Sequence, residues 1–225
     1  MIPTMNISKS DMVAHSLACR ILGESFYKPP QPDLWNQIVT EQLFASWVLP
    51  DDDPFTKRGL DLLNTFTQQA NDTTLALLHR DYGALFVGPA KLKAPPWESV
   101  YLSRDHILFE KQTVEVRAFY AAYGLQTNCL HVEPDDHFGL ELLFLAHLFG
   151  TALAKSEANN PAEQARIIGG VTRFAENHLL KWAEPFLARV VYHAETNYYR
   201  GMAYLAGGLL SSLCAKLALE WELEL

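Results

Sequence analysis

Apolar side chains recur every three or four residues along most of this chain, which predicts amphipathic helices rather than strands. The first run follows Ser8 and Asp11, which together resemble a capping box, and it ends near Tyr27, just before a proline cluster. A short second helix, capped by Asp33, is expected to continue to Leu43. No β-hairpin signal competes with this pattern.

The later segments follow the same period and predict an all-α fold, a single compact helical bundle over residues 1–225. Two packed halves are the alternative, with the extended segment 126–135 as their junction. The expected helices are two between residues 56 and 86 with a break at 71–72, then 113–123, 136–155, 165–191 and a last one after residue 195.

Composition is typical of a protein that folds unaided, with 49% hydrophobic and 12% aromatic residues in a chain of 225. Cys19, Cys129 and Cys214 are far apart and odd in number, which predicts neither a disulfide framework nor a zinc site and fits a reducing compartment. The N-terminus lacks a secretory signal pattern. The apolar runs 138–154 and 201–215 fit buried core helices better than membrane spans. We therefore expect a cytoplasmic protein.

The net charge is −8, the isoelectric point is near 5.4, and no cluster of lysine and arginine is present. A phosphate backbone would meet a mostly repulsive surface, so nucleic acid is excluded as a partner. The same surface would favour the approach of a basic peptide, although mild acidity is also ordinary for soluble proteins.

Standard catalytic motifs such as a P-loop, a nucleophile elbow or a zinc-protease helix are absent from the sequence. The densest polar stretch is 133–137, and Glu141 follows His137 on the same helix face. Asp136, His137 and Glu141 could form the centre of a small metal- or nucleotide-dependent hydrolase. A simpler interpretation is that Asp135 or Asp136 caps the following helix, which is compatible with contact to a partner.

Aromatic residues beside turns form the second unusual feature. Trp97 follows two prolines in the most irregular part of the chain, where a role in binding competes with a role as a core anchor. His178, Trp182 and Phe186 recur at helical spacing, and such a stripe is more typical of packing.

Three segments together resemble the TorD/DmsD family of redox-enzyme maturation chaperones. The second of them, with its two prolines before Trp97, resembles the DmsD branch. Towards the C-terminus, Leu180 and Lys181 depart from the branch pattern. The three segments are Tyr82-x-x-Leu85-Phe86-Val87-Gly88-Pro89, Pro95-Pro96-Trp97-Glu98-Ser99-Val100-Tyr101-Leu102 and Glu133-Pro134-Asp135-Asp136-His137-Phe138-Gly139.

The resemblance implies a cytoplasmic all-helical chaperone and not an enzyme. Its partners would be the twin-arginine leader and the catalytic subunit of a molybdopterin oxidoreductase similar to dimethyl sulfoxide reductase. It would support cofactor loading before export, without being integral to the membrane and with only transient contact to the Tat machinery. A monomer and a homodimer both fit, and contact with guanine nucleotide or the molybdenum cofactor stays open.

The resemblance also carries leader-binding positions onto this chain. A twin-arginine leader has a basic front and an apolar, helix-forming middle, so its receptor needs an apolar groove with acidic residues near one end. Apolar contact would come from Leu85, Phe86 and Trp97, and Asp136 or Asp135 would pair with arginine. The full set is Tyr82 (where the branch usually has Trp), Leu85, Phe86, Pro96, Trp97, Asp136 and His137, with Glu133 and Asp135 as further candidates.

Overall fold

The computed structural model describes residues 7–103, 108, 111–127 and 133–225. Within these residues all regular secondary structure is helical apart from a single isolated β-bridge, so the predicted all-α class is confirmed. The elements are α1 (Lys9–Tyr27), α2 (Pro32–Thr40), the 3₁₀ turn η1 (Leu43–Ser46), α3 (Pro54–Gln68), α4 (Thr74–Tyr82), the π-helical turn η2 (Gly83–Val87), α5 (Glu98–Leu102), α6 (Lys111–Ala122), α7 (Phe138–Glu157), α8 (Pro161–Phe174), the π-helical turn η3 (Ala175–Leu179), α9 (Leu180–His193) and α10 (Asn197–Leu217).

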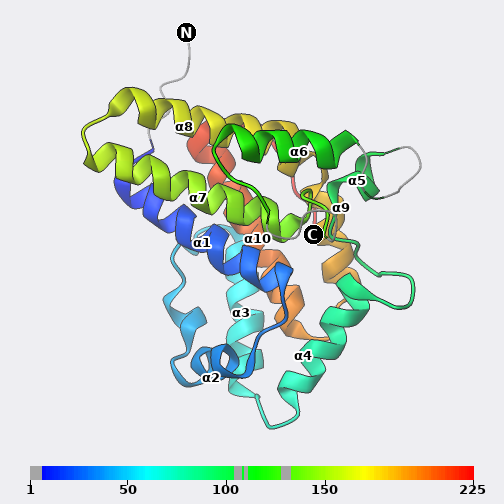
Figure 1. Cartoon of the computed structure of the whole chain (residues 1–225). Helices are drawn as coiled ribbons and strands as arrows, with labels where there is room; N and C mark the ends of the chain where they lie inside the picture. The colour runs from blue at the N-terminus through cyan, green and yellow to red at the C-terminus, as the bar shows by residue number, and fades with distance from the viewer. Residues whose placement is uncertain (1–6, 104–107, 109–110, 128–132) are drawn as a thin grey trace.

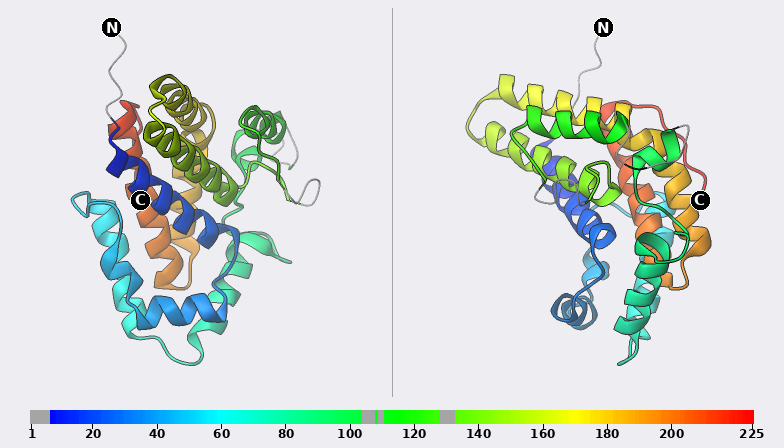
Figure 2. Two further views of the ribbon diagram at one scale, coloured as in Figure 1. Left: turned by 60° about the vertical axis from the view of Figure 1, so that its left-hand side comes forward. Right: turned by 45° about the vertical axis from the view of Figure 1, so that its right-hand side comes forward.

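Six of the helices gather in two groups with α10 between them. In Figure 1, α6, α7 and α8 lie together at one end, α2, α3 and α4 lie at the other, and α10 runs between them. Figure 2 shows the same arrangement in two further views. The most extensive helix pairs are α1 with α7 and α3 with α10.

Both of these helix crossings depend on glycines that let two backbones approach. A Cβ on Gly23 of α1 would lie 2.9 Å from the carbonyl oxygen of Gly139 in α7, and a Cβ on Gly139 would lie 2.7 Å from that of Gly23. Gly59 of α3 and Gly201 of α10 meet in the same way. Larger side chains at these positions would force the helices apart.

One of the two caps predicted for α1 and α2 is present in the structure and the other is not. The capping box of α1 is confirmed, because the amide of Asp11 donates to Ser8 Oγ at 3.1 Å and the amide of Ser8 donates to the Asp11 carboxylate at 2.9 Å. Asp33 as the cap of α2 is wrong: the helix begins at Pro32, whose fixed φ suits the first helical position. The helix also ends before Leu43, because Gln42 adopts a left-handed conformation with φ 49°.

The chain from 161 to 193 is more divided than the expected single helix. A π-helical turn at Ala175–Leu179 separates α8 from α9, and Pro185 lies inside α9. The possible junction of two halves at 126–135 stays a prediction, since residues 128–132, with Cys129, lie outside the described part of the chain.

Among the described residues, α7 is the one helix long and apolar enough to cross a membrane by those two criteria. More than half of its apolar stretch is buried inside the protein, where α7 packs between α1 and α8. The prediction of a buried core helix at 138–154 is thereby supported.

Candidate functional site

The first of the three segments that carry the family resemblance joins α4 to a tight turn. The π-helical turn η2 ends at Gly88, where φ is 99°, a conformation that favours glycine. The loop then returns over η2, since the amide of Ala94 donates to the carbonyl of Leu85 at 3.0 Å. Leu85 is fully buried and Phe86 is 3% exposed.

Aromatic packing holds this first segment against the rest of the core. The Phe86 ring contacts the edges of Phe26 and Tyr199, and the Tyr82 hydroxyl donates to the Phe26 carbonyl at 3.1 Å. Phe26 in turn meets Phe138 of the third segment, with ring centroids 5.0 Å apart. The first and third segments therefore converge on α1.

The second and third segments lie directly beside each other. Trp97 and His137 form the isolated antiparallel bridge, and the amide of Phe138 donates to the carbonyl of Pro96 at 2.8 Å. The Trp97 indole N–H donates to Glu133 Oε1 at 2.6 Å. We refer to residues 82–89, 95–102 and 133–139 together as the motif cluster.

Asp136 lies at the centre of the motif cluster and is fully buried. One carboxylate oxygen accepts from the amide of Ser99 at 2.8 Å, and the other accepts from the hydroxyl of Thr113 at 2.6 Å. Ser99 lies in the first turn of α5, so Asp136 caps α5. Both oxygens thus have partners inside the protein.

The cap of α7 itself is His137, so the expectation that Asp135 or Asp136 fills that position is wrong. The Nδ1 atom of His137 accepts from the amide of Gly139 at 3.0 Å. Burial lowers the pKa of His137 to about 3, because the charged imidazolium would lose its hydration. His137 is therefore neutral, with its proton on Nε2.

Asp135 is also buried and already paired. Arg117 Nη2 lies 2.7 Å from its Oδ2 atom, and the hydroxyl of Thr127 donates to its Oδ1 atom at 2.9 Å. The Tyr120 hydroxyl donates to its backbone carbonyl at 3.0 Å. Asp135 therefore ties α6 and the start of the 126–135 segment to α7.

Glu98 of the motif cluster and Glu141 of α7 are two further buried acids, of which the sequence interpretation singled out only Glu141. Glu98 Oε2 is 3.0 Å from His178 Nδ1, and the indole N–H of Trp182 donates to Glu141 at 3.3 Å. Glu141 is fully buried, and its Oε1 atom has no hydrogen-bond partner. Burial, followed by the charges of Glu98 and Asp136, raises the pKa of Glu141 well above its usual value.

The stripe of His178, Trp182 and Phe186 lies inside the core, as expected for a packing role. His178 is 6% exposed and the other two are fully buried. The sequence interpretation missed the hydrogen-bonding partner of His178, Glu98, although an acid directly after Trp97 in an apolar stretch was a signal for a buried carboxylate.

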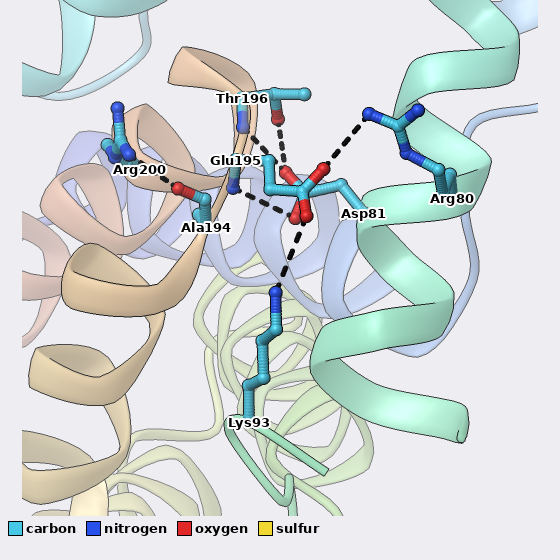
Figure 3. A network of polar contacts seen from close by, with 7 residues as sticks. All are labelled: Arg80, Asp81, Lys93, Ala194, Glu195, Thr196 and Arg200. Atoms are coloured by element: carbon cyan, nitrogen blue, oxygen red, sulfur yellow. Dashed lines mark hydrogen bonds and ion pairs between the residues drawn. The ribbon is translucent and has the colours of Figure 1, made fainter. Parts of the chain in front are cut away.

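A further buried carboxylate, Asp81, precedes the first segment and was missed entirely. It accepts from the amides of Glu195 and Thr196 at 3.0 and 2.8 Å and from the Thr196 hydroxyl at 2.7 Å. Thr196 is the cap of α10, so Asp81 on α4 holds the cap residue in place. Figure 3 shows this arrangement, together with the exposed ion pairs of Glu195 with Arg80 and Lys93. Only its position before an aromatic turn marked this aspartate in the sequence.

The predicted leader-binding residues are thus brought together, but most of them face inward. Trp97 and Glu133 are partly exposed, whereas Tyr82, Leu85, Phe86, Pro96, Asp135, Asp136 and His137 are buried. Their contact with a leader stays a prediction.

The catalytic alternative finds little support in this geometry. Asp136 and His137 are engaged in caps, Glu141 is sealed behind them, and none of the three is more than 3% exposed. In the described part of the chain, no group of three or more His, Cys, Asp or Glu side chains is arranged to hold a metal ion.

Comparison with known proteins decides the family. The family model described as nitrate reductase delta subunit matches residues 50–188, more than half of the chain. The chain belongs to this family.

Named relatives within this family agree with the TorD/DmsD resemblance, which is confirmed. The chain is 28% identical over 204 residues to the Tat proofreading chaperone DmsD of Salmonella typhimurium, covering 90% of each protein. It is 30% identical over 211 residues to the chaperone protein YcdY of Escherichia coli, covering 92% of this chain and 97% of YcdY. The chaperone protein TorD of Shewanella pealeana is 26% identical over 210 residues, covering 90% of this chain and 88% of TorD.

A solved structure supports the fold alone. The crystal structure of a putative redox enzyme maturation protein from Archaeoglobus fulgidus superposes with a TM-score of 0.53 at 16% identity, covering 86% of this chain and 92% of that one. The all-α bundle is therefore shared beyond recognisable sequence similarity.

Proposed function

We propose that this protein is a cytoplasmic, system-specific chaperone of redox-enzyme maturation. It binds the twin-arginine leader of a molybdopterin oxidoreductase catalytic subunit of the dimethyl sulfoxide reductase kind, and it supports cofactor loading before export. The observation that carries the proposal is the match with the Tat proofreading chaperones over 90% of the chain.

Charge supports the choice of partner. The chain has a net charge of −8, and a leader that begins with a basic segment would be attracted to it. Attraction of this kind accelerates encounter and weakens with added salt.

Affinity capture tests the proposal most directly. The tagged protein is recovered from anaerobically grown cells of its own organism, and the bound proteins are identified by mass spectrometry. We expect the catalytic subunit of a molybdopterin oxidoreductase, and we expect its capture to be lost when its leader is deleted. Capture of unrelated proteins alone would contradict the proposal.

The hydrolase that the sequence offered, with Asp136, His137 and Glu141 at its centre, is not favoured by the buried positions of these residues. Metal analysis and a nucleotide-hydrolysis assay on the purified protein distinguish it from a chaperone. Turnover that disappears in Glu141→Gln would favour the hydrolase.

A further inference from the structure

A continuous groove runs along the C-terminal end of α1. One cavity of about 420 Å³ lies between α1, α7 and residues 125–127, and a second of about 440 Å³ lies between α1 and α2. Tyr27, Lys28 and Leu143 line both of them. A third cavity of about 110 Å³, between α1, α2 and η1, shares Glu24 and Leu34 with the second. We call this surface the α1 groove.

The α1 groove is largely apolar and accessible. Leu34 on α2 is 42% exposed and Leu43 on η1 is 39% exposed, while Leu143 of α7 and Trp47 are partly exposed. Leucines and tryptophan gathered around one depression favour contact with an apolar partner over isolated exposure.

The charges along the α1 groove differ between its two ends. At the α2 end, the side chain of Glu24 is 55% exposed, and Glu41 is exposed two residues before Leu43. At the α7 end the basic lining residues are His147 and Lys28, and Lys28 also lines the second cavity but not the third. The pair of Glu24 with Arg20 on α1 is exposed, so it contributes little and can be exchanged for another partner.

The motif cluster lies directly behind the wall of the α1 groove, because its residues contact side chains that line the groove. The ring of Tyr27, which lines the groove, meets the His137 ring at 5.3 Å between centroids. Thr127 and Tyr120 also line it, and both donate hydrogen bonds to Asp135. The buried motif residues therefore position Tyr27 and Thr127, which are partly exposed at the wall of the groove.

We propose that the α1 groove is the surface that receives the twin-arginine leader, an inference that rests on the proposed function. The arginine pair lies at the α2 end near Glu24 and Glu41, and the apolar segment runs from there over Leu43 and Leu34 towards Leu143. The occupant follows from complementarity: the groove is apolar with one acidic end, and the leader is apolar with one basic end. A leader in the reverse direction would bring its arginines to Lys28.

The apolar part of the proposal is tested with synthetic leaders of the organism's own molybdopterin oxidoreductases. Leu34→Gln and Leu43→Gln, singly and together, are titrated with the labelled leader that the wild-type protein binds best. We expect the double variant to bind about tenfold more weakly, because the apolar contact is replaced by an amide that must lose its water. Leu77→Gln, at a leucine of α4 that is 36% exposed, is the matched control and should bind like the wild type.

The direction of the leader is tested by charge reversal. Glu24→Lys and Glu41→Lys are compared with Glu157→Lys, which makes the same charge change at the far end of α7. Each variant is titrated with an Arg-Arg leader and with its Gln-Gln counterpart. We expect the first two to lose about fivefold affinity for the Arg-Arg leader alone, and less at high salt.

The outcomes separate the inference from the function on which it rests. Circular dichroism and thermal melting verify that every variant is folded, as its exposed position predicts. If the wild type binds leaders and all groove variants bind equally well, the groove is overturned and the proposed function stands. A change of dimerisation without a change of leader affinity would assign the groove to a second copy and also overturn it. If the wild type binds none of the leaders, the proposed function itself fails.

Discussion

The motif cluster and the α1 groove lie side by side and differ in almost every physical respect. In the motif cluster, Phe86 and Asp136 are sealed from solvent and fully engaged with partners. In the α1 groove, Leu34 and Leu43 are exposed and cover an apolar depression. The residues that make the family recognisable are thus mainly those that assemble the fold, and the accessible surface beside them consists of less distinctive side chains.

Buried carboxylates explain why the recognisable residues face inward. A carboxylate removed from water is costly unless several donors surround it. Asp136 satisfies this requirement in the first turn of α5, and Asp81, directly before the first segment, satisfies it at the two residues that precede α10. Each aspartate therefore connects two parts of the chain, which a surface residue could not do as strongly.

The largest expected effect is a difference in the free energy of unfolding between a substitution in the motif cluster and one in the α1 groove. Phe86→Ala should lower the free energy of unfolding by about 3–5 kcal/mol, because a buried ring that contacts Phe26, Tyr82, Phe186 and Tyr199 is lost. Leu43→Gln, in the α1 groove, should change it by less than about 0.5 kcal/mol. Urea unfolding measures both. If Phe86→Ala lowers the free energy of unfolding as little as Leu43→Gln does, the motif cluster is open in solution.

Asp136 gives the next largest effect. Asp136→Ala leaves the amide of Ser99 and the hydroxyl of Thr113 without an acceptor, so we expect a loss of about 3 kcal/mol in urea unfolding. Asp136→Asn should lower the free energy of unfolding less. The asparagine oxygen can still accept from the backbone amide of Ser99, and the hydroxyl of Thr113 can rotate to accept from the new side-chain NH2 group. Full stability in both variants would refute the capping role.

The same Asp136→Asn variant tests the arginine contact expected from the family resemblance. If Asp136 acts through the fold, the variant changes affinity for an Arg-Arg leader and a Gln-Gln leader by the same factor. If the double-mutant cycle shows that only the affinity for the Arg-Arg leader falls, then segment 133–139 opens and the Asp136 carboxylate contacts arginine.

The sequence predicts the helices well and the environment of the motif residues poorly. Helical periodicity and the Ser8 capping box are local signals, and both are confirmed. Whether Asp136 caps its own helix or α5 depends on the pairing of Trp97 with His137, a contact between distant segments that periodicity does not encode. A resemblance identifies important positions without saying whether they are buried.

The α1 groove was missed for the same reason. Its lining comes from α1, α2, η1 and α7, and no single segment carries a pattern that marks it. Leu34 and Leu43 simply continue a helical period in the sequence. Their exposure becomes visible only once α2 is placed beside α1.

The buried carboxyl group of Glu141 gives the stability of the native state a pH dependence. The raised pKa of Glu141 means that the native state holds a proton that the unfolded chain releases above about pH 4.5. The stability of the native state therefore falls as the pH rises above about 4.5. Glu141→Gln removes the titrating group, so it should remove this fall. Thermal melting from pH 5 to 8 should show that the variant loses less stability than the wild type as the pH rises, with the largest difference at the upper end.

Glu141→Ala is the control for this prediction. It also removes the titrating group, but it leaves the indole N–H of Trp182 without its acceptor and creates a cavity, so it should be less stable at every pH. Identical pH profiles for the wild type and Glu141→Gln would mean that Glu141 is already ionised in the native state.

His137 should produce the smallest effect, with the opposite sign. Its pKa is about 3 in the native state and near 6.5 in the unfolded chain, so between these values the unfolded state binds the additional proton. Native stability is complete above about pH 6.5 and is lost as pH falls towards 3. His137→Asn keeps an acceptor for the amide of Gly139 and removes the titration. We expect about 1 kcal/mol less acid destabilisation between pH 6.5 and 5.5, measured by urea unfolding, with His147→Asn on the exposed side of α7 as the control. An unchanged pH slope in His137→Asn would show that the imidazole is hydrated in solution, which would place the motif cluster in contact with solvent and remove its contrast with the α1 groove.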